Sequence, residues 1–133
     1  MRLLPRIAII GCAAMLASGA GLAQRADDKI APESAALVEQ GKAALAAGKL
    51  TEAEGLFETA LAIDPRNRWA YVDIARVAEK QRLYGKAIRM TNRALALNPN
   101  DPDAIAVQGQ AMVQLGAVAR AQANLQKLQQ VCK

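Results

Sequence analysis

The sequence predicts an all-α protein, an α-solenoid of three helix–turn–helix units that follow one another along the chain. The first observation is a period of 34 residues, which places Pro65 on Pro99 and Ala53 on Ala87 and then Ala121. A fixed period of this length indicates a repeat array. The second observation is that no segment alternates apolar and polar residues with the period of two that a half-buried strand requires.

The first unit, residues 34–67, predicts a helix, a turn, a second helix and a stop. Gly48 lies between the two helical patterns, where a left-handed turn suits glycine. Thr51 and Glu54 have the spacing of a capping box, which we expect to begin the second helix. Asp64 precedes Pro65 and is disfavoured in the α region, so the second helix ends there. Apolar and small residues recur at helical spacing in both halves: Leu37, Gly41, Ala44 and Leu45, then Leu56, Phe57, Ala60 and Leu61.

Small residues mark the places where the two helices of a unit are expected to touch. Gly41, Ala53 and Ala60 let the backbones approach each other, and a larger side chain would overpack the contact by roughly 1–3 kcal/mol. The third unit begins with Asp101 as N-cap and Pro102 as first helical residue. Its second helix has apolar residues on one side and glutamines elsewhere, as the terminal unit of a solenoid requires.

This pattern resembles the tetratricopeptide repeat, whose motif is W-x2-L-G-x2-Y, then A-x3-F, then P. Gly41, Ala53, Phe57, Ala60 and Pro65 match it, whereas Leu37 and Ala44 replace the aromatic residues. In the second copy Thr91 replaces the phenylalanine, and in the third Leu128 replaces an alanine. The resemblance implies a right-handed superhelix with units 34–67, 68–101 and 102–133 in one domain, 34–133.

In this family the first helix of each repeat lines a concave groove that holds a peptide. The resemblance therefore implies a partner-binding groove formed by Val38, Lys42, Trp69, Asp73, Arg76, Lys80, Gln110 and Gln114. Trp69, Arg76 and Lys80 are the residues of greatest interest, because aromatic and Arg side chains dominate binding hot spots. Trp69 has packing between repeats as an alternative role. The family's clamp for a terminal carboxylate is not expected, because Val38 and Asp73 occupy positions that would need polar or basic groups.

The second unit is rich in basic residues, namely Arg68, Arg76, Lys80, Arg82, Lys86, Arg89 and Arg93. Two interpretations stay open. These side chains form a solvated face whose stems cover apolar surface, or they form a surface that attracts an acidic peptide, an envelope polymer or anionic lipid. Without Arg2 and Arg6 there are 15 basic against 12 acidic residues, and the net charge falls from +5 to +3. This mild positive charge does not indicate a nucleic-acid partner.

The N-terminal segment, residues 1–23, has the parts of a bacterial secretory signal. Arg2 and Arg6 precede an apolar core, Ile7 to Leu16, and cleavage is expected after Ala23, with Ala20 as the alternative. A retained membrane anchor is the alternative, although the apolar run is shorter than the ~20 residues that span a bilayer. A lipoprotein interpretation at Cys12 leaves too short an apolar core. Residues 24–33 are expected to be a flexible linker, and the mature protein is expected in the periplasm or secreted.

The sequence offers no catalytic, metal or cofactor site. It contains no His, and after cleavage one Ser and one Cys remain, so no Ser-His or Cys-His pair can form. Neither a metal-loop spacing nor a phosphate-binding glycine loop is present. Cys132 is expected either to form an intermolecular disulfide or remain a free thiol, or to pack behind Leu125 and Leu128 as a small apolar residue, which we prefer.

These observations favour an exported or periplasmic adaptor that binds another protein or peptide, an acidic one among the candidates, and performs no chemistry. The alternative is a structural envelope component that self-associates as a homo-oligomer, or attaches to the membrane through a retained leader. Fold does not fix function, so the identity of the partner is not readable from the sequence.

Overall fold

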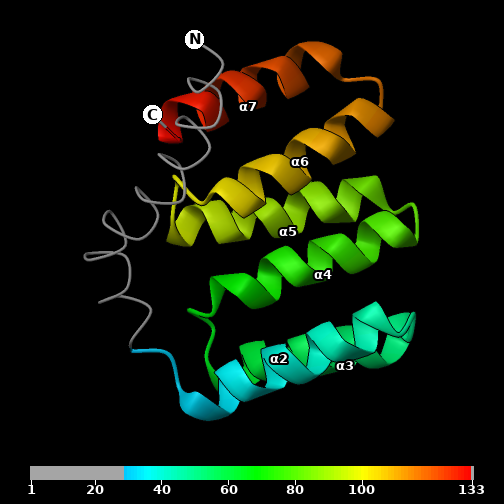
Figure 1. The fold of residues 1–133 in the computed structure, drawn as a ribbon, viewed down its shortest axis with the longest axis vertical. Coiled ribbons are helices and arrows are strands. Elements are labelled where there is room, and N and C mark those ends of the chain that lie inside the picture. The colour runs from blue at the N-terminus through cyan, green and yellow to red at the C-terminus, as the bar shows by residue number, and fades with distance from the viewer. Residues whose placement is uncertain (1–28, 133) are drawn as a thin grey trace, which may run out of the picture.

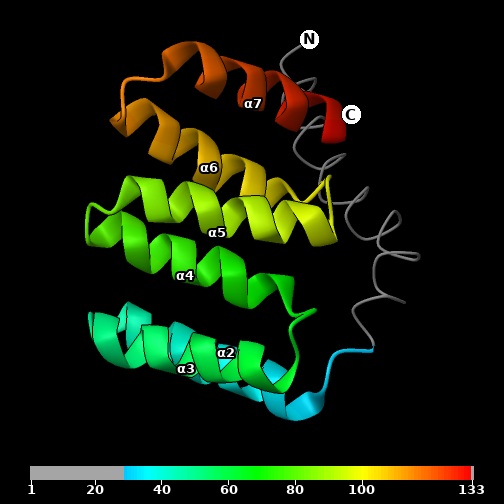
Figure 2. The same ribbon diagram turned by 180° about the vertical axis from the view of Figure 1, so that it is seen from behind.

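A computed structural model describes residues 29–132, which fold into six α-helices with no strand among them. The helices are α2 (Pro32–Ala46), α3 (Leu50–Ile63), α4 (Arg68–Lys80), α5 (Tyr84–Leu97), α6 (Pro102–Gln114) and α7 (Val118–Val131). They form antiparallel pairs that stack from α2 and α3 at one end to α7 at the other (Figures 1 and 2). The predicted all-α solenoid of helical repeats is thereby confirmed. The predicted leader, and the linker up to residue 28, lie outside the described residues.

The turn inside each pair contains one residue in the left-handed region, at the same place in the 34-residue period. These residues are Gly48 with φ of 79°, Arg82 with φ of 62° and Gly116 with φ of 77°. Glycine adopts this conformation without strain, whereas for an L-residue it costs roughly 1–2 kcal/mol. The predicted glycine turn at Gly48 is confirmed, and Arg82 occupies the strained equivalent in the middle pair.

The helix ends agree with the sequence at Asp64 and at Asp101 but not at Thr51. Helix α3 ends at Ile63 because Asp64 is extended before Pro65. The Asp101 carboxylate caps α6 by accepting from the N–H groups of Asp103 at 3.0 Å and Ala104 at 3.3 Å.

The predicted capping box at Thr51 and Glu54 is wrong. Helix α3 already begins at Leu50, and its N-cap, Lys49, makes no side-chain capping bond. Because Gly48 completes the turn, the first helical residue precedes Thr51 and leaves that residue inside the helix. Glu54 instead forms an ion pair with Lys86 of α5 and so links the first helix pair to the second.

The core runs between the helices of the first two pairs and α6, and it does not extend to α7. Phe57 is fully buried against Gly41, where an added Cβ would lie 2.4 Å from the nearest atom of the Phe57 ring. Ala53 and Ala60 are also fully buried. The small residues of the first unit are therefore packing requirements. Helix α7, by contrast, buries none of its residues, and Leu125 is 55% exposed.

The preferred interpretation of Cys132 as a packed thiol is wrong, because Cys132 forms a disulfide. Within residues 29–132, α7 buries none of its residues, and Leu128 and Cys132 on its apolar stripe are partly exposed. The disulfide-bonded sulfur of Cys132 is therefore not the free thiol that packing would leave.

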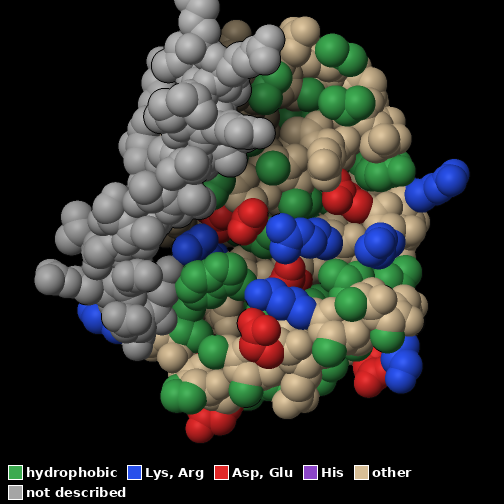
Figure 3. Space-filling view, viewed as in Figure 1, with side chains coloured by type: hydrophobic (Ala, Val, Ile, Leu, Met, Phe, Trp, Pro, Cys, Tyr) green, Lys and Arg blue, Asp and Glu red, His purple; other side chains and the backbone are tan. Residues whose placement is uncertain are grey.

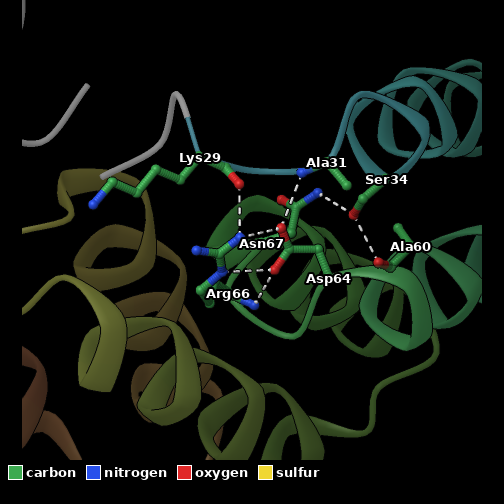
Figure 4. Close-up of polar contacts among 7 residues, drawn as sticks. All are labelled: Lys29, Ala31, Ser34, Ala60, Asp64, Arg66 and Asn67. Carbon is green, nitrogen blue, oxygen red and sulfur yellow. Dashed lines mark hydrogen bonds and ion pairs between the residues drawn. The ribbon is translucent and has the colours of Figure 1, made fainter. Parts of the chain in front are cut away.

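Polar contacts fix the start of α2 to the loop between α3 and α4 (Figure 4). The Ser34 hydroxyl donates to the Ala60 carbonyl at 2.6 Å and accepts from the Asn67 side chain at 2.9 Å. The Asp64 carboxylate accepts from the Ala31 N–H at 2.9 Å and from the Arg66 guanidinium at 3.0 Å. These bonds, with that guanidinium foremost, hold the pKa of the Asp64 carboxyl well below its ordinary value.

Within the described part of the chain, no helix combines the length and the apolar character needed to cross a bilayer.

Candidate functional site

The first helices of the three pairs, α2, α4 and α6, contribute side chains to one shared face, which we call the concave face. A pocket of about 350 Å³ opens on it. Its lining comes from all three helices: Leu45 of α2, Arg76, Glu79 and Lys80 of α4, and Val107 and Gln110 of α6. Residues more than 60 positions apart in the sequence therefore meet at one opening because the pairs stack in register.

Ion pairs lie on the concave face, one of them between two helices and two within a helix. The Arg76 guanidinium donates to Asp73 Oδ1 at 2.7 Å and lies 3.7 Å from the Asp103 carboxylate of α6. On α2 the Lys42 ammonium pairs with Glu39 at 3.2 Å. Figure 3, which views the side where α2 lies in front of α3, shows acidic and basic side chains next to each other across the middle. The concave face is therefore mixed in charge.

Asp73 is the most unusual side chain of this face. Its residue is 2% exposed, and its Oδ2 atom is buried without a hydrogen-bond partner. Burial raises the pKa of the Asp73 carboxyl, and the opposing effects of Arg76 and Lys42 do not offset that rise. Burial likewise raises the pKa of the Glu79 carboxyl on the pocket lining. An acceptor without a donor is costly in a folded protein, so Asp73 Oδ2 calls for an explanation.

The structure brings together three of the groove residues implied by the sequence, since Arg76, Lys80 and Gln110 line the pocket. Lys42 and Gln114 are exposed on α2 and α6 but do not line it. Val38 is 4% exposed and belongs to the core, so its side chain is not available at the surface. Trp69 also packs against that core, with the Arg68 guanidinium 4.3 Å from its ring centroid.

Leu45, Glu79 and Val107 complete the pocket and were not among the implied groove residues. Each lies three residues from an implied one, after Lys42, after Arg76 and before Gln110 respectively. Helical neighbours at this spacing share a face, and that rule would have identified them.

The basic residues of the second unit do not form one surface. Three of them are paired with carboxylates of other helices or loops: Arg68 with Asp101 at 2.5 Å, Arg76 with Asp103, and Lys86 with Glu54. Arg89 and Arg93 are exposed on α5, which contributes nothing to the pocket. Among residues 29–132 there is also no cluster of acidic, Cys or His side chains that could hold a metal ion.

Comparisons with known proteins agree on the fold. A model of the tetratricopeptide repeat family matches residues 44–110. Similar solved structures include the second repeat domain of Spaghetti (RPAP3) bound to the HSP90 peptide SRMEEVD, at TM-score 0.72 and 19% identity over 81% of this chain and 98% of that one.

The repeat domain of Sgt2 from Aspergillus fumigatus is also similar, at TM-score 0.72 and 25% identity over 76% of this chain and 67% of that one. The Yersinia enterocolitica type III secretion translocator chaperone SycD has TM-score 0.72 and 16% identity, covering 76% of both chains. No curated protein matches the chain.

Proposed function

Because the chain belongs to the tetratricopeptide repeat family, we propose that it is a non-catalytic adaptor that binds a segment of another protein on its concave face. The observation that carries this proposal is the pocket to which α2, α4 and α6 all contribute side chains. Concave sites that combine apolar walls with a few polar groups are the usual places for a ligand. The Spaghetti structure, which holds a peptide, supports a peptide partner for this chain as well.

The proposal includes export. Its support is the pattern of residues 1–23, which lie outside the described residues. The intact mass of the protein recovered from the envelope tests this part. Loss of residues 1–23 is expected, and a full-length mass would instead favour a protein held at the membrane by its leader.

The groove can be tested by a photoreactive amino acid placed at Gln110 on the pocket lining, with Asn92 of α5 as the matched control. Both residues are exposed to solvent, and neither side chain belongs to the apolar core clusters. Irradiation of intact cells should yield a crosslinked partner from Gln110 and not from Asn92. Crosslinks from Asn92 alone would move the binding site to the α5 surface and contradict the proposal.

Reversing the charge of a single residue gives a second test of the groove. Lys80→Glu changes an exposed residue of the pocket lining that forms no ion pair within residues 29–132, so folding should be preserved. Arg93→Glu makes the same change on α5. Capture of the partner should change with Lys80→Glu and stay as in the native chain with Arg93→Glu, provided that both variants keep the native circular dichroism spectrum.

Self-association is the second candidate function, and one observation favours it. Leu115, Val118 and Leu125 are each more than half exposed around α7, which buries no residue. Exposed apolar surface of this kind can mark an interface. Light scattering after gel filtration would decide between the two: a monomer leaves the adaptor as the sole proposal, whereas a dimer that Leu125→Lys dissociates supports the structural role.

A further inference from the structure

We infer that the concave face selects a segment that brings a hydrogen-bond donor on a basic or amide side chain to Asp73, and that it disfavours acidic segments. This inference rests on the adaptor function proposed above and names the chemistry of its partner. It differs from the sequence-based expectation that an acidic peptide is among the candidates.

The charge balance of the concave face gives the first argument. Its cations are Lys42, Arg76 and Lys80, and its carboxylates are Glu39, Asp73, Glu79 and Asp103. Four carboxylates against three cations leave this face with one excess negative charge. An acidic segment would therefore meet no field that attracts it, and like charges placed together across an interface are strongly unfavourable.

Two of the three cations of this face already form ion pairs with its carboxylates. Lys42 is already paired with Glu39, and Arg76 with both Asp73 and Asp103. An incoming carboxylate would have to break one of these contacts to gain its own. Lys80 is the one cation of this face without an ion pair in residues 29–132, and its chain neighbour Glu79 offsets its charge.

Asp73 gives the second, independent argument. Its Oδ1 accepts from Arg76, whereas its Oδ2 is buried and has no donor. Asp73 does not line the pocket itself, but its Oδ1 accepts from Arg76, which does, and Lys42 of α2 and Asp103 of α6 are near enough to affect its pKa. A donor on a long, slender side chain such as Lys or Gln that enters beside Arg76 would satisfy this buried Oδ2.

The pocket defines what accompanies the donor. Leu45 and Val107 supply apolar walls, and Glu79 adds a carboxylate with no hydrogen bond or ion pair in the described part of the chain. A segment with a basic or amide residue close to an apolar one therefore fits both features. Burial raises the pKa of Asp73, and a bound cation would lower it again, so binding of a basic segment should weaken as the pH falls through that pKa.

The test is a synthetic array of ten-residue peptides of basic, amide-rich and acidic composition, probed with the full chain. Three proteins are compared: the native chain, Asp73→Asn and Glu58→Gln. Asp73→Asn keeps an acceptor for Arg76 and removes the charge, whereas Glu58→Gln makes the same charge change at an exposed position of α3. Dissociation constants of the best basic peptide and its acidic counterpart are then measured at two pH values.

The native chain and Glu58→Gln should prefer basic or amide-bearing peptides over acidic ones by about tenfold or more, and Asp73→Asn should lose most of this preference. A preference of the native chain for acidic peptides would overturn the inference, as would an unchanged preference in Asp73→Asn. Failure of the adaptor proposal looks different: either no peptide binds, or Lys80→Glu leaves binding of every peptide unchanged.

Discussion

The first and last helix pairs apply one repeat pattern with opposite results. Phe57 of α3 is fully buried, whereas Leu125, two periods later on α7, is 55% exposed. Between them Thr91 is fully buried, and its hydroxyl donates to the Ile88 carbonyl at 2.9 Å. The same register thus holds an aromatic core residue, a satisfied polar residue and a surface residue. What differs for Leu125 is that no further helix pair packs on α7 within residues 29–132, because each pair relies on its neighbour to cover its apolar face.

The chemistry between helices changes along the array as well. In the first pair Phe57 fills the space over Gly41. In the last, the Gln108 side chain donates to Thr91 and accepts from Asn124, so amides take the place of an aromatic ring. The polar network makes its bonds over short distances, 3.1 Å and 2.9 Å. Buried amides are acceptable there because each has a partner.

The largest effect should come from truncating the two apolar residues of this register. Phe57→Ala is expected to cost about 3–5 kcal/mol of unfolding free energy, because it opens a cavity in the core. Leu125→Ala should change it by less than about 0.5 kcal/mol, since the side chain is mostly in water. Urea unfolding of both variants measures the difference. Equal costs would mean that α7 is covered in solution and would break the comparison.

A second test uses the motif glycines, Gly41 and Gly109. In Gly41→Ala the new methyl would collide with the Phe57 ring, at a cost of about 1–3 kcal/mol. In Gly109→Ala the nearest atom is the Asn124 Cβ at 3.7 Å, an ordinary contact, so helix propensity should stabilise the protein by about 0.5–1 kcal/mol. Thermal unfolding of the two variants should shift in opposite directions, and shifts of the same sign would show that the glycines are equivalent.

The turns allow a smaller test. Arg82→Gly removes a side chain from a left-handed residue and should stabilise the fold by about 0.5–1 kcal/mol, after the added freedom of the unfolded chain is counted. Gly48→Ala introduces the same strain into the first pair and should destabilise by about 1 kcal/mol. Chemical denaturation measures both. A destabilised Arg82→Gly would mean that the Arg82 side chain makes a contribution larger than the strain.

The smallest effect concerns pH and Asp64. Because its folded pKa is lowered, Asp64 stabilises the protein above its unfolded pKa of about 4 and loses that contribution as the pH falls toward the folded pKa. Solvent screening at the exposed Arg66 limits the contribution to about 0.5–1 kcal/mol. The unfolding free energy of the native chain should fall between pH 4 and lower values more steeply than that of Asp64→Asn. Parallel pH profiles would contradict this assignment.

The sequence predicted the fold well because the repeat is a local pattern. Helix ends at Asp64 and Asp101 and the turn at Gly48 follow from the chemistry of single residues. Thr51 was misassigned because a capping box signals the type of boundary more reliably than its position. For the candidate site, the family register pointed to Arg76, Lys80 and Gln110, and it missed Leu45, whose role depends on how α2 meets α4 and α6.

The sequence by itself determined the architecture, because the 34-residue period, the turn glycines and the proline stops act within one unit or between adjacent units. Only the tertiary structure decided the chemistry of the concave face. In the sequence nothing indicates an ion-pair partner for Arg76 on another helix. In the structure it pairs with Asp73 of its own helix and with Asp103 of the next pair. Likewise nothing in the sequence indicates that Asp73 is buried. Helix packing buries its Oδ2 without a hydrogen-bond donor. Partners and burial depend on contacts between units, which a repeat pattern does not encode.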